Sequence, residues 1–392
     1  MEPSSVLQVI TKYNRGSQNA AIDLDNLESN IQLALKLAAG KPLRIVTKSI
    51  PSVEILRKVM VGTDTKKLLV FGEHVVQTYL DTLPNDTEYL YGHPLSNEQV
   101  VRLISHPNGS KIVFLADSLE VLKNLNDVAI LMGHPVRVAL DFDIGLHRGG
   151  VTQSELKDCA DYLKSQTGNL EFCGFLGYEG QGQVLPMNLL KEMNFRSSLK
   201  LYQEMITEFF SYQPSLKSDA LIVNSGGSRT LSYYRRFGVD FTSDIAVGSI
   251  FLMPSDFSSD LEPLGFKAAL YFTSPIVRIR KRARIPFLGV FTYFLALFWS
   301  SVRSMYVTLG GGWDAVPQSP DLTMFPLMES DAEKGLPPGQ RMLGGNSDLG
   351  LRLGDLVLYR PIESSNLGHF AVVLLLKGGQ ISEIIPVERI LD

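Results

Sequence analysis

Cysteine is scarce in this chain of 392 residues, which contains only Cys159 and Cys173. Cys159 lies in a helix-like run and Cys173 in a strand-like run, so we expect two buried thiols in a reducing compartment and no disulfide. The sequence also lacks a block of basic residues, and its formal charge of −4 argues against nucleic acid as a partner. Residues 1–5 have neither the basic start nor the apolar core of a secretory signal, so the expected location is cytoplasmic.

Up to about residue 250, strand-like and helix-like runs alternate regularly. The helix-like runs, with apolar residues at helical spacing, are 25–39, 52–61, 97–105, 119–132, 152–165 and 189–212. The strand-like runs, short, apolar and mostly closed by Gly, Asp or Asn, are 43–48, 68–72, 88–92, 111–117, 136–143, 170–178, 220–224 and 244–248. Eight such units in about 220 residues predict an α/β fold, a parallel (β/α)8 TIM barrel, with an open doubly wound sheet as the alternative.

After about residue 250 most strand-like runs follow one another without helices between them. These runs are 268–271, 275–279, 305–309, 355–359, 371–376 and 381–386. They predict a second, mostly-β domain. Because residues 6–11 are also strand-like, we expect residues 1–20 to contribute a strand to this β domain, residues 21–252 to form the barrel, and residues 253–392 to form the C-terminal domain.

The C-terminal domain contains a hydrophobic insertion at residues 285–302, which carry no charge. Basic residues precede it: Arg278, Arg280, Lys281, Arg282 and Arg284. The length is marginal for spanning a bilayer, and spanning would split the β domain, so this interpretation is disfavoured. A buried or subunit-interface element is the preferred interpretation, and a hairpin or helix lying on a membrane surface is the alternative.

Several chemically active side chains lie where predicted strands end, and TIM barrels carry their chemistry at those ends. Lys48 ends the first strand, Arg148 lies in the turn after the fifth, and Tyr178 ends the sixth. Turns 224–228 and 248–249, after the last two strands, offer backbone amides and hydroxyls for a phosphate. Singly, each motif could be a surface lysine or an ordinary turn. Together they are the groups that bind pyridoxal 5'-phosphate.

In this order the motifs resemble the alanine-racemase-like fold (fold type III) of pyridoxal-phosphate enzymes, and more closely its D-threonine aldolase, D-serine dehydratase and amino acid deaminase/aldolase branch. The resemblance covers nearly the whole chain and is carried by residues 21–25, 47–49, 143–150, 176–179, 223–227, 336–339 and 354–355. It implies that Lys48 forms a Schiff base, that Arg148 lies near the phenolic oxygen of the cofactor, and that Tyr178 stacks on its ring. The other implied cofactor-binding residues are Asn224, Ser225, Gly226, Gly227, Ser228, Gly248 and Ser249.

The sequence departs from the family pattern in three respects. Ala246 stands where racemases have an arginine facing the pyridine nitrogen. The racemase C-terminal segment Gly-Tyr-x-Asp-Gly, which supplies a second catalytic tyrosine, has no counterpart, so two-base racemisation is disfavoured. Pro361 and Glu363 stand where the aldolases and dehydratases have paired metal ligands, and one carboxylate does not make a metal site. We therefore expect no bound metal.

The resemblance implies a pyridoxal-phosphate-dependent lyase acting on a small, D- or β-hydroxy amino acid by aldol cleavage or deamination through an external aldimine. Lys48 would hold the cofactor and act as a base. Arg148 and His147 are the other catalytic candidates, with a structural hydrogen-bond donor as the alternative for His147. Glu179 is expected either to position water or substrate or to be an exposed loop carboxylate. A racemase and a catalytically silent cofactor-binding protein are the alternative functions, and a homodimer is the expected assembly.

Overall fold

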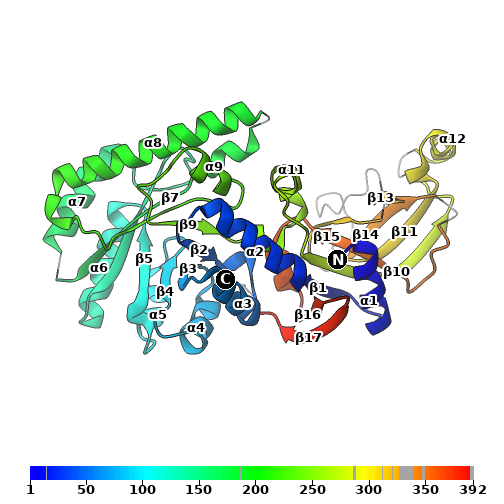
Figure 1. The fold of residues 1–392 in the computed structure, drawn as a ribbon, viewed down its shortest axis with the longest axis horizontal. Coiled ribbons are helices and arrows are strands. Elements are labelled where there is room, and N and C mark those ends of the chain that lie inside the picture. Colours follow the sequence, from blue (N-terminus) through cyan, green and yellow to red (C-terminus); the bar gives the residue numbers. More distant parts are fainter. Residues whose placement is uncertain are drawn as a thin grey trace. The chain divides into compact units, whose positions relative to one another are not determined.

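The computed structural model describes residues 1–14, 16–166, 168–185, 187–285, 288–310, 312–319, 321–325, 339–346 and 349–388 (Figure 1). Residues 336–338, part of one family-like stretch, and residues 286–287 of the hydrophobic insertion lie outside this part of the chain. Two compact units are present. One is Ile31–Ile250, and the other combines Met1–Asn30 with Phe251–Arg389.

The unit Ile31–Ile250 is built around a closed barrel of parallel strands. The strands are β2 (Leu43–Val46), β3 (Lys67–Val70), β4 (Glu88–Tyr91), β5 (Ile112–Ala116), β6 (Val136–Phe142), β7 (Leu170–Gly177), β8 (Ile222–Ser225) and β9 (Asp244–Val247). The ring closes because β2 pairs with both β3 and β9. The predicted strands and the predicted TIM barrel are confirmed, and the doubly wound alternative is wrong.

The helices around the barrel include one that precedes β2 and others that follow most of the barrel strands. They are α2 (Leu24–Ala38), α3 (Val53–Thr63), α4 (Glu73–Thr82), α5 (Asn97–Ile104), α6 (Leu119–Met132), α7 (Leu156–Ser165), α8 (Asn188–Tyr212), α9 (Leu231–Arg236) and α10 (Ser249–Leu252). Local sequence explains several boundaries: Ser96 begins α5 with a capping box, and Gly133 ends α6 in the left-handed conformation. The sequence did not predict α4, α9 or α10; α9 and α10 have only six and four residues and so give little periodic signal.

Two layers fill the barrel interior. An apolar layer contains Leu69, Leu90, Leu115 and Leu176, among others. Near the amino ends of β2, β3, β4 and β9 lies a charged layer made of Arg44, Lys67, Glu88 and Asp244. The guanidinium of Arg44 is fully buried; its Nε donates to Asp244 Oδ1 at 2.9 Å, and it also pairs with Glu88. This charged layer closes the mouth of the barrel opposite the predicted site.

The second unit contains a nine-stranded sheet. In the path β13-β14-β11-β10-β1-β16-β17, strand β1 is parallel to β16 and antiparallel to β10. Strand β15 pairs with β10 and β12. The predicted mostly-strand C-terminal domain is confirmed. The strands are β1 (Asn19–Asp23), β10 (Leu270–Lys281), β11 (Ser304–Leu309), β12 (Ala315–Pro317), β13 (Leu322–Met324), β14 (Gln340–Gly345), β15 (Leu356–Pro361), β16 (Val372–Lys377) and β17 (Gln380–Pro386).

The strand predicted at residues 6–11 is wrong, because the structure has helix α1 (Pro3–Tyr13) there. Val6 and Ile10 are four residues apart and both fully buried, so they share one face of a helix, where a strand would alternate its side chains. Pro3 at the first position suits a helix start. The segment that does join the sheet is β1, which follows α1.

The hydrophobic insertion forms helix α12 (Phe291–Phe298), and a further short helix, α11 (Ser258–Leu261), lies earlier in the chain. Most apolar side chains of the insertion that the structure describes are exposed, Phe298 to 81% and Leu297 to 66%. The interpretation as an element buried within this chain is therefore wrong. No helix among the described residues is long and apolar enough to cross a membrane.

Both cysteines are buried free thiols, as predicted. Burial raises the pKa of Cys159 to about 12 and that of Cys173 to about 11. Neither thiol is therefore poised for nucleophilic chemistry near neutral pH.

Candidate active site

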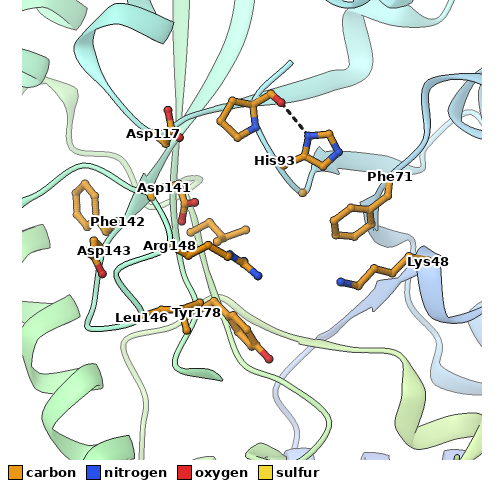
Figure 2. A pocket seen from close by; sticks show the side chains of 14 residues that line it. Lys48, Phe71, His93, Asp117, Asp141, Phe142, Asp143, Leu146, Arg148 and Tyr178 are labelled. Atoms are coloured by element: carbon orange, nitrogen blue, oxygen red, sulfur yellow. Dashed lines mark hydrogen bonds between the residues drawn. The ribbon is translucent and has the colours of Figure 1, made fainter. Parts of the chain in front are cut away.

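A cavity of about 370 Å³ lies at the carboxyl ends of barrel strands β2 to β7 (Figure 2). Three predicted site residues line it together: Lys48, Arg148 and Tyr178. They are far apart in the sequence, and each directly follows a strand or lies in the turn after one. Figure 2 shows Lys48 and Arg148 pointing toward each other across the cavity, with Tyr178 at its side.

Lys48 reaches the cavity from a turn of 3₁₀ helix, Thr47–Ser49, that follows β2. Its Nζ lies 5.0 Å from the centroid of the Phe71 ring, which follows β3 and was not predicted as a site residue. An aromatic face attracts the ammonium ion, and it also shields one side of the amine from water. The lysine is thus held beside an apolar wall while its amine stays accessible from the cavity.

Arg148 is aimed into the cavity by the turn that follows β6. Asp143 Oδ1 accepts hydrogen bonds from the backbone N–H groups of Gly145 and His147, each at 3.0 Å. His147 adopts a positive φ of 54°, which reverses the chain just before Arg148. The Arg148 Cζ lies 6.0 Å from the centroid of the Tyr178 ring. The cation and the ring therefore face one space.

His147 itself does not line the cavity. Its side chain is 81% exposed, and its Nδ1 lies 2.8 Å from Asp143 Oδ2. Burial acts to raise the pKa of Asp143, but the hydrogen bonds from His147 prevail and the pKa of this carboxyl is lowered. This geometry fits the structural alternative, in which His147 supports the turn that presents Arg148.

Asp141 lines the cavity and was missed by the sequence analysis. It is the sixth residue of β6, partly buried, and shares the cavity with Arg148 and Asp117. Burial and the negative charge of Asp117 raise the pKa of Asp141 to about 7, although the Arg148 cation acts to lower it. This carboxyl therefore changes charge near neutral pH. The alternation of side chains along a strand does not show which alternating residues face the cavity, so nothing in the sequence singles out Asp141.

We expect Asp141 to make stability fall as pH rises. The pKa of Asp141 in the folded state lies above the unfolded value of about 3.9. Its contribution to the free energy of unfolding is therefore present at low pH and lost as pH rises through 7. In urea titrations, Asp141→Asn should gain about 2 kcal/mol relative to the wild type between pH 5 and pH 8. Asp143→Asn is the matched control. The pKa of the Asp143 carboxyl is lowered, so this variant should not become more stable relative to the wild type as pH rises. Parallel curves for wild type and Asp141→Asn would contradict the assignment.

The two predicted phosphate loops contact each other. Ser228 Oγ accepts hydrogen bonds from the backbone N–H groups of Gly248 at 3.3 Å and Ile250 at 3.1 Å. Ser249 Oγ lies 3.1 Å from the Oγ of Ser49, the residue after Lys48. The loops are thus joined to the segment that carries the lysine. They do not themselves line the cavity described above.

Asn224 is turned away from that cavity. Its Nδ2 donates to Asp244 Oδ1 at 2.6 Å, in the charged layer at the opposite mouth of the barrel. The Asn224 side chain is therefore engaged outside the cavity, and the predicted role of Asn224 in cofactor binding stays a prediction. Ser225, in contrast, belongs to a network at the site, because its Oγ lies 2.6 Å from the Tyr234 hydroxyl.

Glu179 supports the first phosphate loop. It is only 1% exposed, and it accepts hydrogen bonds from Gly226 N–H at 3.1 Å, Thr230 Oγ1 at 2.7 Å and the Tyr234 hydroxyl at 3.0 Å. Burial raises the pKa of Glu179. The interpretation as an exposed loop carboxylate is wrong, while a role in positioning water or substrate stays a prediction. Glu179 instead fixes the backbone of Gly226, whose φ of +109° suits glycine.

His93 is another residue of the cavity that the sequence analysis missed, and it follows β4. Its Nδ1 lies 2.8 Å from the carbonyl oxygen of Pro94, which can only accept, so Nδ1 is the donor in this contact. The His93 ring packs edge-on against Tyr91 and lies beside Phe71, with centroids at 5.2 and 6.0 Å. The cavity therefore has one imidazole on the same wall as the lysine.

No group of three or more His, Cys, Asp or Glu side chains that could hold a metal occurs among the described residues. Pro361 ends β15, and the Glu363 carboxylate accepts a hydrogen bond from Ser365. The expectation that no metal is bound stays a prediction.

The sequence and the structure of this chain both resemble those of known proteins. Residues 22–186 match the family described as alanine racemase, N-terminal domain. The D-threonine aldolase from Filomicrobium marinum superposes with a TM-score of 0.74 at 16% identity, covering 95% of this chain and 96% of that one. The chain has the alanine-racemase-like fold.

Other proteins share this alanine-racemase-like fold at similarly low identity. The D-threo-3-hydroxyaspartate dehydratase from a Delftia species gives a TM-score of 0.71 at 12% identity, with 96% of this chain and 98% of that chain covered. The alanine racemase of Clostridium difficile gives 0.64 at 14% identity, with coverages of 94% and 98%. No curated protein sequence matches the chain significantly. The recognition of the fold is confirmed, while these identities leave the reaction open.

Proposed function

We propose that this chain is a pyridoxal-phosphate-dependent enzyme acting on a small amino acid. The observation that carries the proposal is the grouping of Lys48, Arg148 and Tyr178 around one cavity at the carboxyl ends of the barrel strands. When bound, pyridoxal 5'-phosphate supplies an aldehyde for covalent attachment and a ring that withdraws electrons from the bonds at the amino acid Cα.

The residues present fit this cofactor in charge and size. A cavity of about 370 Å³ is in the range of small-molecule sites. Lys48 offers an amine beside the apolar face of Phe71, Arg148 offers a cation for an anionic oxygen, and Tyr178 offers a flat ring. We assign the phosphate to the loops 225–228 and 248–249, whose backbone is held by Glu179 and Ser228.

Within this class we propose a lyase reaction on a D- or β-hydroxy amino acid. The aldolase and the dehydratase named above superpose with TM-scores of 0.74 and 0.71, against 0.64 for the racemase named above, which supports this choice. Position 246, where racemases have an arginine, holds a buried alanine. The candidates for moving a proton in the cavity are Lys48 Nζ, the His93 imidazole and the Asp141 carboxyl, all of which line it. Burial and the charge of Asp117 raise the pKa of Asp141 to about 7.

A substrate panel tests the reaction class. The purified chain, incubated with pyridoxal 5'-phosphate, should convert at least one D- or β-hydroxy amino acid, releasing an aldehyde if it cleaves the Cα–Cβ bond or ammonia if it deaminates. Assays for both products, run with matched L-enantiomers, distinguish the two reactions. Interconversion of enantiomers without release of either product would identify a racemase. A cofactor-dependent spectrum with no turnover of any substrate would identify a silent cofactor-binding protein.

Tyr178→Ala should weaken cofactor retention. Loss of ring stacking removes about 0.5–1.5 kcal/mol, which corresponds to a rise in dissociation constant of roughly 2- to 13-fold. Tyr178→Phe keeps the ring and is the matched control, so its affinity should stay near that of the wild type. Equilibrium dialysis measures both. Equal weakening in the two variants would assign the effect to the hydroxyl, and no weakening in either would place Tyr178 outside the cofactor site.

A further inference from the structure

The β unit carries an exposed apolar surface on the hydrophobic insertion. We call it the α12 patch, and it consists of Leu288, Val290, Phe291, Tyr293, Phe294, Leu297, Phe298 and Trp299, each between 37% and 81% exposed. Figure 1 shows α12 beyond the ends of β10 and β11, away from β16 and β17 of the same sheet. A helix on the surface of a water-soluble unit usually turns polar residues outward. Here both faces are apolar, so we expect the outer face to be covered by another molecule.

The patch is held in place by its inner side. Thr292 is fully buried, and its Oγ1 accepts the backbone N–H of Ile285 at 3.0 Å. Leu295 and Ala296 pack against a small buried cluster that includes Val302. At the other end Arg303 Nε donates to the Ala296 carbonyl oxygen at 2.8 Å, where a cation suits the C-terminus of a helix. The exposed rings are therefore presented from a fixed base.

A stretch of sequence that is rich in basic residues and has no acidic ones surrounds the patch. The sequence contains no Asp or Glu between Glu262 and Asp314, and in the same interval it contains seven basic residues. Five of these precede the patch in β10 and the turn after it, and all five are exposed: Arg278, Arg280, Lys281, Arg282 and Arg284. Among the described residues none of the five makes an ion pair with a carboxylate. An apolar patch and a group of exposed cations therefore adjoin each other in the sequence, from the end of β10 through α12.

We propose that the α12 patch inserts into the surface of a lipid bilayer that carries anionic headgroups, and so anchors the protein peripherally. Aromatic and aliphatic side chains with flanking Arg and Lys are the composition of interfacial membrane-binding segments. Helix α12 has eight residues and is about 12 Å long, against about 30 Å of hydrocarbon, so it enters one leaflet and does not span. The basic flank would lie at the level of the lipid phosphates.

A second copy of the chain is the other occupant of an apolar patch, and the charges disfavour it. Docking two α12 patches against each other would bring together two sets of five cations that make no ion pair with a described carboxylate, and these sets would repel. An anionic lipid surface turns the same cations into an attraction. The inference does not depend on the proposed reaction, because it uses only residues of the insertion.

Vesicle cosedimentation of the full-length chain tests the proposal. The wild type should bind vesicles of phosphatidylcholine with roughly 30% phosphatidylserine, and bind pure phosphatidylcholine at least tenfold more weakly. Binding to the anionic vesicles should also fall as salt is raised. Two triple variants should each weaken it by more than about tenfold: the apolar variant Phe294→Ser, Leu297→Ser, Phe298→Ser and the charge variant Arg278→Glu, Arg280→Glu, Lys281→Glu.

Matched controls use equally exposed residues of the barrel unit. These are the apolar triple Val61→Ser, Ile130→Ser, Leu131→Ser and the charge triple Lys123→Glu, Lys164→Glu, Lys217→Glu. Both should bind as the wild type does. Equal binding by the α12 variants and their controls, or no binding to anionic vesicles at all, overturns the proposal. If the wild type does not bind vesicles and the apolar α12 variant has a lower mass in solution than the wild type, the patch is an interface with a second copy of the chain and the membrane proposal is overturned.

Discussion

Asp244→Ala should lower the free energy of unfolding by about 3–5 kcal/mol. Asp244 is fully buried and is the principal partner of the buried Arg44, whose Nε and Nη2 donate to its two carboxylate oxygens at 2.9 and 3.0 Å. It also accepts from Lys67 Nζ at 3.1 Å. Removing the carboxylate leaves a buried guanidinium with only the partly exposed Glu88 as counter-ion. The free energy lost by leaving a buried charge uncompensated is larger than the net stabilisation that the intact ion pair provides.

Urea unfolding measures this loss, with Asp86→Ala as the matched control. Asp86 pairs with Lys66 on the surface, and exposed pairs contribute about 0–1 kcal/mol. Asp244→Asn keeps the shape and part of the hydrogen bonding, so it should fold if Asp244→Ala does not. Burial acts to raise the pKa of Asp244, but Arg44 holds it below its ordinary value. The stabilisation is therefore lost as pH falls below about 4. A loss under 1 kcal/mol for both Asp244 variants would contradict this account.

Lys48→Ala should abolish turnover, lowering kcat by at least about 1000-fold. The amine is the group that would bond to the cofactor, and among the residues that the structure describes no other lysine lines the cavity. Cofactor retention should fall as well, since the covalent contribution is lost. Activity measured with the substrate found in the panel, and dialysis of bound cofactor, give the two readouts.

Two further variants separate chemistry from folding. Lys48→Arg keeps a cation beside Phe71 but lacks the primary amine, so it should be as inactive as Lys48→Ala while retaining normal stability. Lys123→Ala changes an exposed lysine of α6 and should leave activity unchanged. Substantial turnover by Lys48→Arg would show that the amine of this residue has no covalent role.

The barrel could be predicted from sequence because its signals are local. Parallel strands buried on both faces appear as short apolar runs, and their helices have a different period. At residues 6–11 the same reasoning failed, since a short apolar run is also compatible with a helix that buries Val6 and Ile10 on one face. Closure of the ring is a tertiary property. It was inferred from the number of units and is visible in the pairing of β2 with β9.

The candidate site was predicted in part, for a similar reason. Lys48 and Tyr178 lie at strand ends, which the sequence marks. Phe71 and His93 also follow strands, but a single aromatic or imidazole there is common and carried no signal. Asp141 was hidden inside a strand, where only the direction of alternation shows that it faces the cavity. Glu179 was misread because its partners come from the following βα unit, which no spacing rule reveals.

Identification of the lysine that bonds to the cofactor tests the central claim most directly. The wild-type chain is incubated with pyridoxal 5'-phosphate, reduced with borohydride and digested, and the modified peptide is identified by mass spectrometry. The account predicts one reduced pyridoxyl group per chain, on Lys48, blocked by Lys48→Ala and not by Lys123→Ala. A stoichiometric adduct on any other lysine, or no adduct above that of Lys48→Ala, would contradict the proposed site.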